Sequence, residues 1–123
     1  MDLGYHVYCI NAKDLATSKA FYQKLGFDYI EKYSSEKRAV MRHNDIHIAL
    51  FQGVIPQNCL NFRGGDIQEI VKEAKGNGLK FDQEAEELPD KTWHARIFDP
   101  DGNEIFLHTD HHERETSLKE HGE

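Results

Sequence analysis

Two histidines in β-rich segments, His94 and His108, are the side chains best suited to acid–base chemistry, because histidine titrates near neutral pH. They lie in the segments "TWHARIF" and "NEIFLHT". Cys59 could act as a nucleophile if a neighbouring base lowered its pKa. We favour the plainer alternative for all three. In this alternative His94 and His108 are strand histidines with ordinary hydrogen-bond partners, and Cys59 is buried and unreactive.

Two arginines, Arg63 and Arg96, could bind an anion. A guanidinium group forms paired, charge-assisted hydrogen bonds with a carboxylate or a phosphate. The chain also has 22 acidic residues against 15 lysines and arginines, so each arginine could instead pair with Glu104 or another acid. The sequence leaves both alternatives open.

The composition limits the class of protein. A chain of 123 residues with 38% hydrophobic content can form one compact domain, or two small modules that share a core. Its net charge of −7, without a long run of Lys and Arg, argues against a nucleic-acid partner. We find neither an apolar stretch of about 18 residues nor a signal-peptide pattern, so no membrane partner is expected. Cys9 and Cys59 do not form a CxxC pair, which favours reduced cysteines in a cytoplasmic protein.

The chain contains a repeat in which the residues that begin and end each helical segment match. In both halves a strand-like run reaches an Asp, a helical segment follows, and a Gly stands twelve residues after that Asp. The matching pairs are Asp14 with Gly26 and Asp66 with Gly78. Asp is a good helix N-cap, and Gly suits the left-handed position that ends a helix.

Helical spacing predicts which residues are buried. One apolar face of the second helix comprises Ile67, Ile70, Val71 and Ala74. In the first helix the equivalent residues are Phe21, Tyr22 and Leu25.

Three β-rich runs follow each helix. They occupy residues 27–34, 37–43 and 46–52, and then residues 80–85, 92–98 and 103–109. The order is therefore β-α-β-β-β, repeated. We expect modules at 1–52 and 58–109, a linker at 53–57 and a polar C-terminal tail at 110–123.

The segments "DLATSKAFYQKLGF" and "DPDGNEIFLHT", set in two βαβββ modules, resemble the vicinal oxygen chelate superfamily. This group includes glyoxalase I, extradiol dioxygenases, fosfomycin-resistance enzymes and bleomycin-resistance proteins. The resemblance extends over nearly the whole chain to His108. It implies an α+β fold in which two curved mixed sheets form a cavity, completed within one chain or by swapped chains. A homodimer is expected, because half-barrels of this size leave apolar sheet surface uncovered.

The resemblance also implies four metal-ligand positions. In this sequence they are Val7, Ala49, Cys59 and Phe106. Three of these side chains have no lone pair to donate, and one cysteine cannot replace a full ligand set. The chain is therefore similar to the metal-free bleomycin-resistance branch, and we expect no cofactor. A bulge in the first strand would put His6 in place of Val7; we favour a regular strand, with His6 on the opposite face.

Alternation along the strands then gives the side chains expected to line the cavity. They are Val7, Cys9, Asn11, Ala49, Phe51, Cys59, Asn61, Arg63, His94, Arg96, Phe98, Phe106 and His108. Trp93, Ala95 and Ile97 should pack on the other side of their strand.

The expected function is metal-free binding of a small organic molecule, anionic or aromatic, in this cavity. We assign no catalytic residue. One alternative is a lyase or isomerase of the glyoxalase type, with a metal in a shifted register or with chemistry based on His and Cys. Another is a non-catalytic module whose cavity is filled by its own Phe51, Phe98 and Phe106.

Overall fold

The computed structural model describes residues 1–109. The predicted tail at 110–123, with His111 and His112, lies outside the described residues. The chain divides into two compact units. The first unit is Val7–Cys59, and the second comprises Met1–His6 together with the described residues from Leu60 onward. Within the described residues, no helix has the length and apolar character needed to cross a bilayer.

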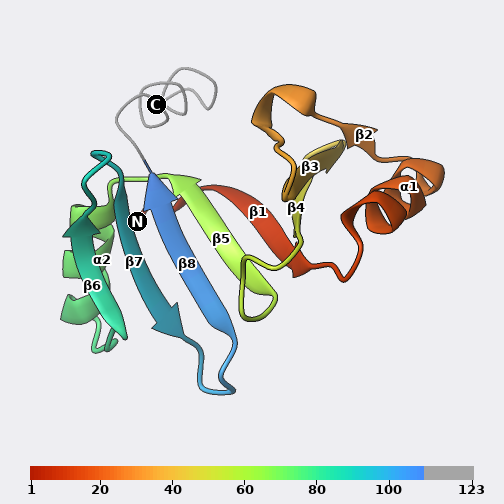
Figure 1. The fold of residues 1–123 in the computed structure, drawn as a ribbon. Coiled ribbons are helices and arrows are strands. Elements are labelled where there is room, and N and C mark those ends of the chain that lie inside the picture. Colours follow the sequence, from red (N-terminus) through yellow and green to blue (C-terminus); the bar gives the residue numbers. More distant parts are fainter. Residues whose placement is uncertain (110–123) are drawn as a thin grey trace. The chain divides into compact units, whose positions relative to one another are not determined.

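The first unit follows the predicted order of elements. Its strands are β1 (Gly4–Asn11), β2 (Asp28–Tyr29), β3 (Arg38–His43) and β4 (Ile46–Phe51), and its helices are α1 (Leu15–Leu25) and the short 3-10 helix η1 (Glu31–Tyr33). The strands are hydrogen-bonded in the order β2-β3-β4-β1. Strand β1 runs parallel to β4, and the other pairs are antiparallel. Helix α1 packs against β3 and β4 (Figure 1).

Helix α1 has the predicted ends but buries less than predicted. Asp14 Oδ1 accepts a hydrogen bond from Thr17 N at 3.1 Å, and the helix ends at Gly26 with a φ of 116°. Tyr22 packs against the buried core of the sheet. The prediction that Phe21 and Leu25 are buried was wrong, because they are 59% and 63% exposed. These two residues are four apart, and they share a helix face that is turned away from the sheet.

Strand β2 is shorter than the predicted run at 27–34. The ladder stops where Ser34 intervenes: its hydroxyl donates to Ile30 O at 2.8 Å and accepts from Val40 N at 2.9 Å. A serine side chain thus takes the place of ladder hydrogen bonds, and η1 begins at Glu31.

The second unit repeats the pattern. Its strands are β5 (Cys59–Gly64), β6 (Gln83–Glu87), β7 (Trp93–Phe98) and β8 (Glu104–Thr109), and its helix is α2 (Ile67–Gly76). The strand order is β5-β8-β7-β6. Helix α2 covers one face of β6, β7 and β8 (Figure 1). The mixed α+β fold with two βαβββ modules is therefore confirmed.

The core of the second unit lies under α2. The helix begins at Asp66, whose Oδ1 accepts from Glu69 N at 3.2 Å. The four predicted apolar residues, Ile67, Ile70, Val71 and Ala74, are all buried. The helix ends two residues before Gly78, which has a φ of +92°, because Asn77 is the cap.

Strand β6 is displaced from the predicted run at 80–85 and includes Glu86 and Glu87, which we expected in a connecting segment. Its register with β7 shifts between Gln83 and Glu86. Bulges and charged side chains are typical of edge strands, where they limit pairing with other chains. Hydrophobic alternation is weak in such a strand, which explains the error.

Candidate functional site

The face of the second unit that points away from α2 carries the predicted polar and aromatic side chains. In the β7–β8 ladder His94 is paired with His108, Arg96 with Phe106, and Phe98 with Glu104. Their neighbours Trp93, Ala95 and Leu107 belong to the core beneath α2, as does Phe62 on β5. Alternation places Asn61 and Arg63 with the first group. We call this set, Asn61, Arg63, His94, Arg96, Phe98, Glu104, Phe106 and His108, the far face of the second unit.

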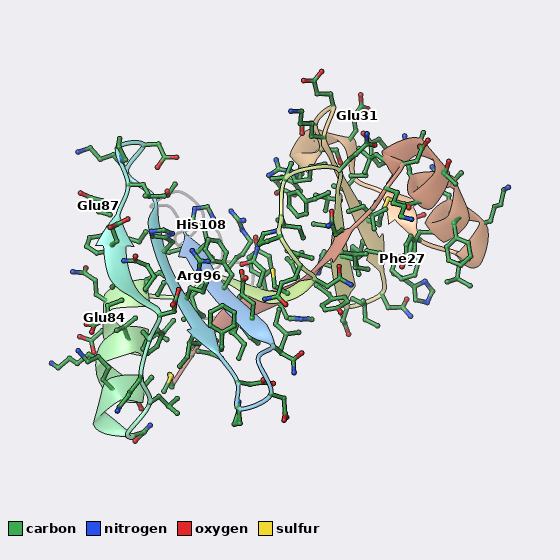
Figure 2. The ribbon with its side chains drawn as sticks, turned by 60° about the horizontal axis from the view of Figure 1, so that its bottom comes forward. Phe27, Glu31, Glu84, Glu87, Arg96 and His108 are labelled. Atoms are coloured by element: carbon green, nitrogen blue, oxygen red, sulfur yellow. The ribbon has the colours of Figure 1, made fainter. Side chains whose placement is uncertain are left out.

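Phe106 lies at the centre of an aromatic group on this far face. Its ring centroid is 5.9 Å from that of His94, in an edge-to-face arrangement, and 5.6 Å from that of His108. Figure 2 shows Arg96 and His108 extending from the adjacent strands β7 and β8. The ladder thus brings an arginine, two imidazoles and a phenyl ring into one small area.

His94 has a defined hydrogen-bond partner. Its Nε2 lies 3.0 Å from Oε1 of Glu86 on β6. The His94 side chain is only 17% exposed, whereas Glu86 is about half exposed. The prediction of a strand histidine with a satisfied hydrogen bond is confirmed, and Glu86 fixes the orientation of the ring.

Arg96 is poorly paired. Its Nε is 3.9 Å from Oδ2 of Asp82, too far for a hydrogen bond. That Nε is buried and has no hydrogen-bond partner among the described residues. Oδ1 of Asn61, a residue only 6% exposed, is also buried and unsatisfied. A buried polar atom left without a partner costs about 1–3 kcal/mol, so both atoms favour a ligand that supplies one. The sequence left open whether Arg96 binds an anion or pairs with an acid of the chain. The acid within ion-pair distance of Arg96 is Asp82, not Glu104.

A carboxylate also stands near His108. Asp90 Oδ1 accepts from Thr92 Oγ1 at 2.6 Å and from Thr92 N at 3.0 Å. These hydrogen bonds, with a smaller contribution from the charge of His108, hold the pKa of Asp90 below its usual value. Asp90 is therefore a stable negative charge in the electrostatic environment of His108.

The first unit has a corresponding face, pointing away from α1. Pairing across β1, β4 and β3 forms three rows, which are Asn11–Phe51–Arg38, Cys9–Ala49–Val40 and Val7–His47–Arg42. The predicted residues of this unit thus share one face, and Val7, Cys9 and Ala49 in it are buried.

Our sequence reasoning missed Arg38. The alternation of "KRAVMRH" could have found it, because Ala39 and Met41 are core residues and Arg38 must then point the other way. Like Arg96, Arg38 has a buried Nε without a hydrogen-bond partner among the described residues.

The fold agrees with the comparisons. The model of the Glyoxalase/Bleomycin resistance protein/Dioxygenase superfamily matches residues 4–57. The chain is therefore similar to that superfamily over this part of its length. No curated protein matches the sequence.

Solved structures resemble the chain over most of its length. A protein from Legionella pneumophila, described as an NAD-dependent benzaldehyde dehydrogenase, has 19% identity and a TM-score of 0.64, over 85% of this chain and 97% of that one. A superfamily member from Vibrio splendidus 12B01 has 16% identity and a TM-score of 0.60, over 87% and 99%. A hypothetical protein from Bacillus halodurans C-125 has 13% identity and a TM-score of 0.61, over 85% and 91%. At these identities the likeness shows the fold alone.

The residues at the superfamily's metal positions do not fit a metal. Val7, Ala49 and Phe106 offer no donor atom, which leaves Cys59. His6 does not replace Val7, since Val7 to Asn11 pair with β4 without a shift. The His6 ring instead lies 5.4 Å from Phe62, a residue that packs against the α2 core. Among residues 1–109, no group of three or more His, Cys, Asp and Glu side chains could hold an ion.

Proposed function

We propose that the protein binds a small molecule with an anionic group and an aromatic body on the far face of the second unit, without a metal. The observation that carries this proposal is the buried, unpartnered Nε of Arg96, a residue paired with Phe106 across the β7–β8 ladder. The arginine has a hydrogen bond to give, and its nearest carboxylate, Asp82, is too distant to accept it.

Each part of the face has a role in this proposal. The guanidinium of Arg96 would bind a carboxylate through Nε and a terminal nitrogen. Phe106 and the partly exposed Phe98 would contact the aromatic body of the ligand. His94, held by Glu86, and His108 would form the sides of the site. The absence of suitable donors at three of the four superfamily metal positions supports the metal-free part.

The experiment compares charged and neutral ligands of the same shape. Benzoate and benzyl alcohol would be titrated into tag-free protein while the Tm is followed. A ligand that binds only the folded state raises the Tm, so benzoate at many times its Kd should raise it by at least about 2 °C. Benzyl alcohol should have little effect. Equal responses, or none, would contradict the proposal.

Metal analysis of the same protein tests the remaining part. Ni²⁺, Zn²⁺, Mn²⁺ and Fe²⁺ should not raise the Tm, and the purified protein should hold no stoichiometric metal. A clear rise that survives removal of residues 110–123 would instead favour the enzymatic alternative, with a metal in a shifted register.

A further inference from the structure

The two cysteines of the chain, Cys9 and Cys59, lie fifty residues apart in sequence but belong to one unit of the fold. Both are buried, with exposed fractions of 3% and 6%, and neither forms a disulfide. Cys9 lies on β1, and Cys59 is the first residue of β5. The first unit, Val7–Cys59, thus has one cysteine near its start and the other at its end.

Two contacts, one on each side of the cysteines, show how β1 and β5 are aligned. In the second unit the ring centroids of His6 and Phe62 lie 5.4 Å apart. In the first unit Asn58 Oδ1 accepts a hydrogen bond from Asn11 N at 2.7 Å. From the first contact to the second, residue numbers rise along one segment and fall along the other. The two segments therefore run antiparallel between these contacts.

This alignment places the two cysteines opposite each other. Cys9 lies three residues after His6, and Cys59 lies three residues before Phe62. Because three is odd, alternation turns both thiols to the face opposite the His6 and Phe62 rings. Opposed residues of antiparallel strands have Cβ atoms about 4.5–5.5 Å apart, and a disulfide spans about 3.5–4.5 Å between Cβ atoms. A small approach of the two backbones is therefore enough to form the bond.

We propose that Cys9 and Cys59 are a site of reversible oxidation, which closes to a cross-strand disulfide on reaction with a peroxide. One thiolate attacks a peroxide oxygen and becomes a sulfenic acid, while the O–O bond breaks and the released hydroxide takes up the thiol proton as water. The second thiol then attacks the sulfenic sulfur. The S–O bond breaks, and the second water leaves with the proton of that thiol. Two thiols are thus oxidised to one disulfide, and one hydrogen peroxide is reduced to two waters.

Cys59 is the thiol that an oxidant reaches first. It follows a mostly exposed connection at residues 52–58, and it is the terminal residue of its strand. Strand ends open locally at a much smaller free-energy cost than the unfolding of a domain. Cys9, in contrast, stands in the middle of the ladder between β1 and β4. We therefore assign the sulfenic acid step to Cys59 and the second attack to Cys9.

The disulfide would join the two ends of the first unit. It would close a loop that contains α1 and most of the strands of this unit, so it would restrict the unfolded chain strongly. The oxidised protein should therefore have a Tm higher by about 5 °C or more, and dithiothreitol should restore the lower value. The site is independent of the proposed function, because the far face of the second unit contains no cysteine.

The test treats the reduced, tag-free full chain with a slight molar excess of hydrogen peroxide and then alkylates it with N-ethylmaleimide in urea. Mass spectrometry counts the adducts. We expect two adducts before oxidation and none after it, with a mass lower by two hydrogens. Tryptic digestion should give residues 1–13 linked to residues 43–63. Dimedone, which traps sulfenic acids, should label Cys59 in C9S and should leave Cys9 unlabelled in C59S.

Matched controls are C9A and C59A, which each keep one thiol, so peroxide should not raise their Tm. Two thiols that stay open to alkylation at a peroxide concentration that oxidises the urea-unfolded chain would overturn the proposal. A disulfide between two copies of the chain, seen as a doubled mass, would also overturn it. A lower Tm after oxidation would contradict the alignment of the two cysteines, and dimedone on Cys9 alone would contradict the order of the two steps.

The main measurement uses the original protein, so a variant that folds poorly leaves the test intact. Benzoate binding at Arg96 involves no thiol and should be the same before and after alkylation of the folded, reduced protein. The two proposals therefore fail separately.

Discussion

Arg96 and Phe106 face each other across the β7–β8 ladder, and the Nε of Arg96 is buried without a hydrogen-bond partner. Phe106 stands at one of the four positions for which the resemblance implies a metal ligand, and in metal-binding members that ligand is expected to be a glutamate. The chain thus has a phenyl ring where a carboxylate would stand, next to a cation. A phenyl ring beside a guanidinium suits an organic anion better than a metal cation, and the proposed function rests on this chemistry.

The ring of Phe106 is predicted to contribute specifically to aromatic ligands. In F106L the site keeps apolar bulk but loses the face of the ring, so benzoate should bind more weakly while acetate binds as before. Stability should fall by less than about 1.5 kcal/mol, because the two side chains are both apolar and of similar size. Calorimetric titration with the two carboxylates measures the difference. Equal losses for benzoate and acetate would show that the ring acts only by packing.

The Asp99 turn is predicted to make stability depend on pH. Asp99 accepts from Asn103 Nδ2 at 2.8 Å, from Asn103 N at 2.8 Å and from Asp101 N at 2.9 Å. The Asn103 side-chain bond first, and then the backbone bonds, lower the pKa of Asp99. The pKa of Asp99 is thus lower in the folded protein than in the unfolded chain, where it is near 3.9. The ionised carboxylate therefore stabilises the fold at any pH above that unfolded pKa, and this stability is lost as the pH falls through the folded pKa.

D99N removes this contribution. Urea unfolding at pH 7 should show a lower free energy of unfolding for D99N than for the original protein, and the gap should narrow as the pH falls below about 3.9. D101N, in the same exposed turn, offers the matched control because the Asp101 carboxylate accepts none of these bonds. A gap that is independent of pH would mean that Asp99 acts through turn geometry rather than charge.

Loss of an apolar side chain is predicted to destabilise the protein strongly in α2 and hardly at all in α1. Ile70 is buried in the α2 core, so I70A should cost about 2–5 kcal/mol of unfolding free energy. Leu25 on α1 is exposed, so L25A should change it by no more than about 0.5 kcal/mol. Chemical denaturation of the two variants gives both values. A large cost in L25A would mean that another surface covers the exposed face of α1 in solution.

Much of the fold can be predicted from local physical signals. Asp14 and Asp66 are caps whose geometry depends only on neighbouring amides, and both helices begin there. Alternation correctly separates His94 and Arg96 from Trp93 and Ala95, because side chains on successive residues of a strand must point to opposite faces.

Features that depend on contacts between distant residues could not be predicted from the sequence. The Ser34 hydroxyl shortens β2 by accepting a hydrogen bond from the amide of Val40, six residues later, and no local sequence pattern predicts this hydrogen bond. Phe21 looks like a core residue but lies on a side of α1 that the sheet does not reach. Likewise, the unsatisfied Nε atoms of Arg38 and Arg96 become visible only when every neighbour has been placed.

The measurement that tests the central claim most directly is the affinity for benzoate of R96Q against that of R42Q. Arg42 is a surface arginine whose Nε already has the acceptor Asn44 O, so it controls for the loss of one positive charge. We predict a loss of about tenfold or more in R96Q and an unchanged Kd in R42Q, since a hydrogen bond to a charged group is worth about 1.5–3 kcal/mol. An R96Q protein that folds normally and binds benzoate as well as R42Q does would contradict the account.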